Sequence, residues 1–169
     1  ILAQAPLLGG APREILEDVQ WADWGPDGAS LAVIRRATGK SRVEYPVGTT
    51  LFEPAGWLSH VRVSPDGARV AFLHHPTQGD DGGEVMSVDR AGARAATHAE
   101  GWITAYGLAW RNAGEIWFTA TRVGVARSIW AVPVSGGRER LLARTPGELT
   151  IQDIARDGRT LMTSDNGMV

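Results

Sequence analysis

The sequence predicts an all-β protein, a β-propeller made of four-stranded antiparallel blades. Three observations support this prediction. A tight-turn sequence flanked by alternating apolar residues recurs along the chain, a second kind of glycine turn alternates with it, and both recur at a similar interval. That interval, about 40–45 residues, is the length of one propeller blade.

The first kind of turn is clearest at Ser64-Pro-Asp-Gly67. Pro65 fixes φ at the first corner, the Asp66 carboxylate is placed to accept turn N–H groups, and Gly67 is suited to positive φ. The glycines that end the four turns of this kind are separated by 39, 47 and 44 residues, and they are Gly28, Gly67, Gly114 and Gly158. Each turn therefore joins the first two strands of one repeat.

The second kind of turn lies between short runs typical of strands, as in Ile129–Leu142. The glycines of these turns are separated by 38, 44 and 44 residues, and they are Gly10, Gly48, Gly92 and Gly136. Because the two series alternate, each repeat contains two hairpins, which make four strands.

Counting strands divides the chain into two half blades and three complete blades. The expected units are half blade 1–18, blades 19–54, 55–99 and 100–147, and half blade 148–169. In one architecture, residues 1–16 pair with 151–163 and close a four-blade ring. In the other, which the lack of an initiator methionine before Ile1 favours, the chain is an arc of a larger propeller.

Composition excludes several classes of protein. The 169 residues are 43% apolar, which is enough for a packed core, and the net charge of −2 gives no basic surface for nucleic acid. No apolar run approaches the length of about 18 residues that a membrane span requires. The absence of cysteine excludes disulfides and thiolate metal sites but leaves the compartment open, whether extracytoplasmic, periplasmic or cytoplasmic.

The repeat resembles the TolB-like or WD-like propeller repeat of bacteria over the whole chain. The Ser-Pro-Asp-Gly turn, the strand Arg69-Val-Ala-Phe72 and the segment Ile129–Leu142 carry this resemblance. Four further segments resemble propeller regions attached to bacterial serine/threonine protein kinases: Tyr45–Gly48, Gly56–His60, Ile116–Arg122 and Pro146–Thr150. The resemblance implies a larger propeller, of about six or more blades, joined to another domain.

The chain carries no recognisable catalytic motif and no motif for a cofactor. It lacks the Gly-x-Ser-x-Gly of hydrolases, phosphate-binding loops and a kinase catalytic loop. The polar stretch His74–Glu84 has imidazoles and carboxylates, but their spacing matches neither an EF-hand nor a zinc motif. We expect a solvated loop there, with no metal.

The seven tryptophans are expected in two kinds of place. Four occupy strand positions that favour packing between blades: Trp24, Trp110, Trp117 and Trp130. The others, Trp21, Trp57 and Trp102, lie in connections that enter the innermost strands, around one mouth of the central channel. Packing is the alternative explanation for these three as well.

We expect a binding surface at that mouth, where four polar residues, His60, Arg62, Tyr106 and Gln152, join the three tryptophans. Mixed donors and acceptors around aromatic rings suit a protein, a peptide or a small polar ligand. Asp23 and Asp153 are expected to accept hydrogen bonds from neighbouring blades, whereas Arg127 is expected on solvated surface.

The sequence therefore predicts a non-catalytic binding module, the sensor or scaffold part of a larger bacterial protein such as a serine/threonine kinase. The alternative is the substrate-gating propeller of a peptidase or hydrolase whose catalytic domain is not in this chain. A stand-alone four-blade interaction module is a third hypothesis. The sequence does not identify the ligand or the oligomeric state.

Overall fold

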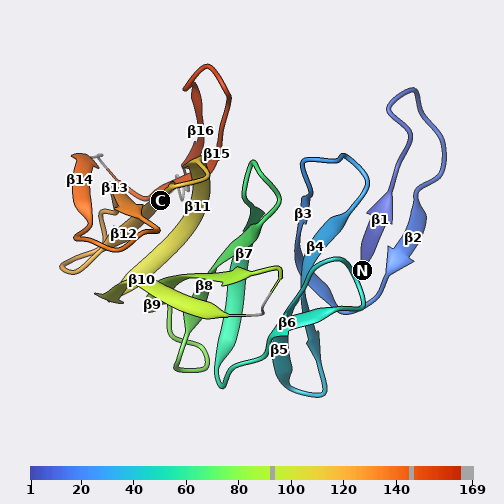
Figure 1. Ribbon diagram of the computed structural model, residues 1–169, viewed down its shortest axis with the longest axis horizontal. Helices are drawn as coiled ribbons and strands as arrows, with labels where there is room; N and C mark the ends of the chain where they lie inside the picture. The colour runs from blue at the N-terminus through green and yellow to red at the C-terminus, as the bar shows by residue number, and fades with distance from the viewer. Residues whose placement is uncertain (92–93, 145–146, 165–169) are drawn as a thin grey trace, which may run out of the picture.

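A computed structural model describes residues 1–91, 94–144 and 147–164, and every regular element in them is a β-strand (Figure 1). The strands form antiparallel sheets, three with four strands and two with two strands. This confirms the predicted all-β propeller architecture of three complete and two half blades. No helix in the described ranges is long and apolar enough to cross a membrane.

Each complete blade consists of four strands that are consecutive in the sequence. The first blade comprises β3 (Val19–Trp24), β4 (Leu31–Ala37), β5 (Lys40–Glu44) and β6 (Thr50–Phe52). The second comprises β7 (Trp57–Val63), β8 (Arg69–His75), β9 (Gly83–Asp89) and β10 (Ala95–Trp102). The third comprises β11 (Thr104–Asn112), β12 (Glu115–Thr121), β13 (Ser128–Pro133) and β14 (Arg140–Ala143).

The two half blades are separate hairpins, one beside the first blade and the other beside the first strand of the third blade (Figure 1). One hairpin is β1 (Leu2–Gln4) with β2 (Arg13–Leu16), and the other is β15 (Leu149–Ile154) with β16 (Thr160–Ser164). Because β1 and β16 belong to different sheets, the alternative of a four-blade ring closed by these segments is not found. The molecule is an arc.

The Pro-Asp-Gly turns are fixed by their own side chains, as the sequence predicts. Gly67 has φ of 70° and donates its N–H to the Ser64 carbonyl at 2.8 Å, while the Asp66 carboxylate accepts the Ala68 N–H at 3.0 Å. In the third blade, Asn112 pairs directly with Glu115. That turn is shorter because it lacks the Pro-Asp pair. The turn expected at Gly92 lies outside the described residues.

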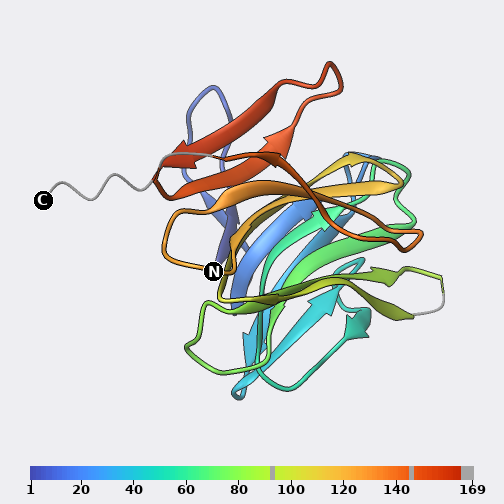
Figure 2. The ribbon, with the colours of Figure 1, turned by 90° about the vertical axis from the view of Figure 1, so that its left-hand side faces the viewer.

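The hydrophobic core consists of two clusters, each shared by two adjacent blades. The cluster between the first and second blades includes Ile34, Tyr45, Leu58 and Phe72. The cluster between the second and third blades includes Leu73, Trp102, Leu108 and Phe118. Phe72 and Leu73 are neighbours on β8 but belong to different clusters, because successive strand residues point to opposite faces of a sheet. Figure 2 shows the strands of successive blades running side by side.

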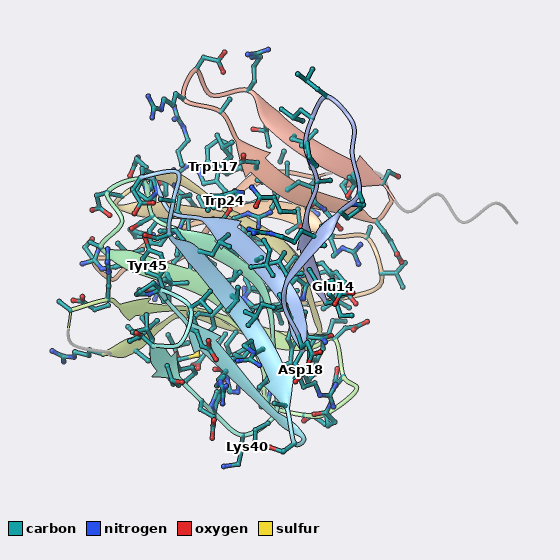
Figure 3. All side chains as sticks on the ribbon, turned by 90° about the vertical axis from the view of Figure 1, so that its right-hand side faces the viewer. Glu14, Asp18, Trp24, Lys40, Tyr45 and Trp117 are labelled. Carbon is teal, nitrogen blue, oxygen red and sulfur yellow. The ribbon has the colours of Figure 1, made fainter. Side chains whose placement is uncertain are left out.

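Of the four tryptophans expected between blades, Trp24 does not pack there. Its side chain is 52% exposed, on the face of the first blade that points toward the β1–β2 hairpin. Figure 3 shows Trp24 near one end of this blade and Lys40 at the other. Trp24 is exposed because the sheet of β1 and β2 has only two strands and leaves that face partly uncovered.

Candidate functional site

The first strands of successive sheets contact one another, so β3, β7, β11 and β15 form the inner wall of the arc. This arrangement brings together three of the predicted mouth residues. The ring centroid of His60 on β7 lies 4.0 Å from that of Trp21 on β3 and 5.5 Å from that of Tyr106 on β11. We call these three residues the His60 cluster.

His60 has an uncommon backbone conformation for a side chain of its size. Its φ is +54°, at a β-bulge where the pairing of β7 with β8 shifts between Ser59 and Arg62. In the third blade, the same position, seven residues before the turn glycine (67 minus 60 and 114 minus 107), is Gly107, with φ of +68°. Holding a residue other than glycine there costs about 1–3 kcal/mol. Such strain is concentrated at functional sites.

A chain of hydrogen bonds fixes the orientation of the His60 ring. The Gly82 carbonyl accepts a hydrogen bond from His75 Nδ1 at 3.0 Å, which means that the hydrogen of neutral His75 is on Nδ1. His75 Nε2 must then accept from Ser59 Oγ, at 2.9 Å. Since the Ser59 hydrogen is used, Ser59 Oγ accepts from His60 Nδ1 at 2.8 Å. The Nε2 atom of His60 is therefore a hydrogen-bond acceptor.

Electrostatics keep both imidazoles neutral. Burial, reinforced by the positive charges of Arg62 and Arg127 and by His75, lowers the pKa of His60 to about 3. Burial also lowers the pKa of His75. The tautomers deduced above therefore hold at neutral pH.

The contact between Ser59 and His75 resembles the serine–histidine pair of a nucleophilic enzyme but lacks its access. Ser59 is 1% exposed, and its hydroxyl both donates to His75 and accepts from His60. The ring of Trp57 stacks on that of His75 with centroids 3.8 Å apart, while the Trp57 indole N–H donates to the Thr77 carbonyl at 3.2 Å. This network supports the ring orientation rather than a reaction.

The polar stretch between β8 and β9, expected to be simply solvated, connects the second blade to the third. The Asp81 carbonyl accepts the Ala105 N–H at 3.0 Å, and the Asp81 carboxylate accepts the Tyr106 hydroxyl at 3.1 Å. Part of the stretch is therefore structural. Among the described residues, no group of three or more histidine or acidic side chains is placed to hold a metal ion.

Arg127, expected on solvated surface, is instead 7% exposed and covers Tyr106. Its guanidinium carbon lies 4.9 Å from the Tyr106 ring centroid, within the range of a cation–π contact. Arg127 Nε also donates to the Leu149 carbonyl at 3.3 Å, so this residue connects the third blade to β15. Its role was missed because nothing in the sequence pairs it with a residue of β11.

Arg62 and Gln152 are joined directly, although they are 90 residues apart. Arg62 donates from Nε and Nη2 to the Gln152 carbonyl, at 3.2 and 2.7 Å, so that the side chain reaches from β7 past β11 to β15. The Gln152 side chain turns away and donates to Thr163 at 3.0 Å. The backbone of Gln152, rather than its amide, therefore makes the contact.

The two aspartates differ in their roles. Asp23 accepts the Val63 N–H from the neighbouring blade at 2.8 Å, as expected, and burial raises its pKa against the opposing effects of that hydrogen bond and of Arg62. Asp153 is exposed, and its carboxylate accepts the N–H of adjacent Ile154 at 2.8 Å. No blade follows β15 and β16 in the described structure, so Asp153 lacks a neighbouring sheet to bind.

Trp102 packs between blades, which is the explanation that the sequence left open as the alternative to a place at the mouth. It is the last residue of β10, the outermost strand of the second blade, and it is 3% exposed. Its ring contacts Phe118 and Trp130, with centroids 5.3 and 4.9 Å away, and carries the Arg122 guanidinium carbon at 3.8 Å. Because β10 continues through this residue, Trp102 packs between blades.

Solved structures with the same fold include TolB proteins and a peptidase. TolB from Acinetobacter baumannii aligns with a TM-score of 0.72 and 18% identity over 98% of this chain and 43% of its own. A putative TolB from Agrobacterium tumefaciens gives 0.61 and 20% over 89% of this chain and 56% of its own. A Mycobacterium tuberculosis puromycin-hydrolysing peptidase gives 0.58 and 20% over 77% and 22%.

These likenesses show the fold, a β-propeller. The chain spans less than two thirds of each of these proteins. No family model and no curated protein sequence matches it.

Proposed function

We propose that this chain is a non-catalytic propeller module that binds a protein, a peptide or a small polar ligand beside the His60 cluster. The observation that carries the proposal is the strained His60. Its ring is fixed between Trp21 and Tyr106, with Nδ1 committed to Ser59 and Nε2 an acceptor. A glycine would adopt this backbone without strain, so the contacts of the histidine side chain must offset that strain.

The surroundings of the cluster fit recognition better than reaction. Trp21 and Tyr106 are half-buried and offer aromatic surface, and Arg62 brings a positive charge to the same wall of the arc. Aromatic residues and arginine are the types enriched where proteins bind partners. Ser59, whose hydroxyl is hydrogen-bonded to His60, is buried.

We further propose that the module is the sensor or scaffold part of a larger bacterial protein, such as a serine/threonine kinase. The resemblance of Gly56–His60 and Ile116–Arg122 to kinase-attached propellers supports this assignment. The alternative is a substrate-gating propeller of a peptidase, which the likeness to a puromycin-hydrolysing peptidase favours. The coding sequence on either side distinguishes the two, because a kinase domain or a Gly-x-Ser-x-Gly domain would be encoded there.

The binding proposal is tested with His60→Asn. Asparagine tolerates positive φ and retains a polar amide, but it removes the ring from between Trp21 and Tyr106. The matched control is Thr38→Asn, because Thr38 also has positive φ, +51°, but lies in the exposed β4–β5 turn.

Binding is measured by NMR titration with hexapeptides of acidic, basic and aromatic composition. We expect a peptide to shift the Trp21 and Trp57 indole signals of the unaltered chain and of Thr38→Asn, with at least about tenfold weaker binding by His60→Asn. If no peptide shifts these signals, or if His60→Asn binds as well as the control, a peptide-binding role for the His60 cluster is wrong.

A further inference from the structure

A groove opens in the outer part of the third blade, and no residue of the His60 cluster lines it. The end of β12, the loop between β12 and β13, and strands β13 and β14 form this groove, which has a volume of about 430 Å³. Ligand pockets commonly have volumes of this order. Among the described residues, its apolar lining includes Val123, Trp130 and Leu141, and its charged lining consists of Arg122 and Arg144.

The groove lies on the face of the third blade that packs against the second blade. The ring of Trp130 on β13 contacts that of Trp102 at the end of β10, with centroids 4.9 Å apart. Leu141 on β14 is opposite Trp130 in the strand register, so both side chains are on this face. The groove therefore depends on two complete blades and on neither terminal hairpin.

The walls of the groove are fixed by hydrogen bonds within the chain. The Trp130 indole N–H donates to the Ala120 carbonyl at 3.2 Å. Arg122 donates to the Glu100 carbonyl at 3.1 Å and also to the Glu139 carboxylate. A binding site that is already ordered loses less free energy when a ligand binds.

The two arginines differ in the charge that they offer to a ligand. The hydrogen bond from Arg122 lowers the pKa of Glu139, so this carboxylate is ionised and neutralises Arg122. Arg144 is exposed, and no acidic side chain in residues 1–91, 94–144 and 147–164 forms an ion pair with it. In the described structure, the groove therefore offers one unpaired positive charge.

The apolar side chains beside this charge are exposed to solvent. Val123 is 84% exposed and Leu141 is 39% exposed, and Val125 in the same loop is 71% exposed. The half-buried ring of Trp130 adds aromatic surface. Apolar surface with a polar rim is typical of interaction sites, and tryptophan and arginine are enriched where proteins bind partners.

We propose that this groove binds a short peptide segment of a partner protein, in which a large apolar side chain is flanked by acidic residues. The apolar side chain lies against Trp130 and Leu141, and a neighbouring carboxylate pairs with Arg144. One unpaired cation beside apolar surface suits such a segment better than nucleic acid, whose row of phosphates requires several cations. The proposal does not depend on what the His60 cluster binds.

The first test titrates the chain with end-blocked octapeptides and follows the indole signals by NMR. In one peptide, a central leucine–phenylalanine pair is flanked by aspartate and glutamate. In a second peptide, lysine flanks the same pair, and in a third, serine replaces the pair between the acidic residues. We expect the first peptide alone to shift the Trp130 signal. The Trp21 signal reports separately on the His60 cluster. No shift of Trp130 by the first peptide, or an equal shift by either of the others, overturns the proposal.

The second test reverses the charge of Arg144. Arg144→Glu should bind the first peptide at least about tenfold more weakly at physiological salt, because attraction becomes repulsion. This difference should shrink at about 1 M salt, where charges are screened within about 3 Å. Leu141→Ser should weaken binding at both salt concentrations, because it removes apolar contact.

The matched control is Arg138→Glu. Arg138 is exposed in the turn between β13 and β14 and does not line the groove, and the two charge-reversal variants have the same net charge. Both variants should keep the melting temperature of the unaltered chain, because exposed substitutions have small effects on stability. Arg138→Glu should bind the first peptide like the unaltered chain. Equal binding by Arg138→Glu and Arg144→Glu would mean that Arg144 does not contact the peptide and would refute the site.

Discussion

At the scale of single residues, His60 is a position where local backbone preference and the observed structure disagree. Its offset from the turn glycine was visible in the sequence, but its left-handed backbone was not, because nothing local predicts a bulge. Trp21, His60 and Tyr106 were predicted to lie together and do so. Ser59 and His75, which orient the ring, were missed because their contact lies next to a β-bulge, where the pairing of β7 with β8 shifts in a way that the apolar alternation does not show.

The buried His60 makes stability depend on pH in a defined direction. Its pKa is about 3 in the folded chain and 6.5 ordinarily, so below pH 6.5 the unfolded chain binds a proton that the folded chain does not. The stabilisation due to His60 is fully present above pH 6.5 and is lost as the pH falls toward 3. We expect the free energy of unfolding of the unaltered chain, relative to His60→Asn, to decrease over that range in urea titrations. The same comparison with Thr38→Asn should show no such slope, and an equal slope for both would contradict the assignment.

A second test concerns the packing of Trp102 between blades. Trp102→Ala removes a 3% exposed ring that contacts Phe118 and Trp130, so we expect a loss of about 3–5 kcal/mol in the free energy of unfolding. Val123→Ala, at an exposed position, should change it by less than about 0.5 kcal/mol. Denaturant titration measures both. A small loss in the free energy of unfolding for Trp102→Ala would contradict the role of this residue in packing between blades.

At the scale of elements, the sequence predicted hairpins well and strand ends less well. Hairpins follow from local turn chemistry, as at Ser64–Gly67, where proline, aspartate and glycine each have one role. The expected boundary between blades 55–99 and 100–147 falls within β10, because pairing with β9 carries that strand on to Trp102. Pairing with neighbouring strands decides where a strand ends, and the local sequence pattern does not show that pairing.

The close approach of β11 to β15 depends on the absence of a side chain at Gly107. A Cβ atom there would lie 2.2 Å from the Ile151 carbonyl oxygen, and φ is +68°. Gly124 has a similar φ of +71° with nothing within 4 Å, so it isolates the backbone effect. We expect Gly107→Ala to cost about 1–3 kcal/mol more than Gly124→Ala in the free energy of unfolding. Equal costs would show that the two strands separate readily.

At the scale of the whole molecule, the period of the repeat predicted the number of blades, but not whether the ring closes. Strand count alone was compatible with a ring of four blades and with an arc. The arc follows from the pairing of the strands, because β1 and β16 belong to different sheets, and no local sequence pattern reports that pairing.

The contact between Arg62 and Gln152 predicts how the last hairpin is held. Arg62→Ala should increase hydrogen exchange in β15 and β16 while leaving β3 to β6 unchanged, because the lost hydrogen bonds end on β15. Arg36→Ala, at an exposed position on β4, serves as the control and should leave both regions unchanged. Uniformly faster exchange in Arg62→Ala would instead indicate global destabilisation.

The shared clusters of the core bear on how the chain folds during synthesis. Neither of the two clusters among the described residues lies within a single blade, so the first blade completes its buried contacts only when β7 and β8 have left the ribosome. Until then, apolar residues such as Ile34 and Tyr45 stay open to chaperones and proteases. During synthesis, each blade should therefore become protected from proteases only after the next blade has been made. Protection should increase in steps of about one repeat.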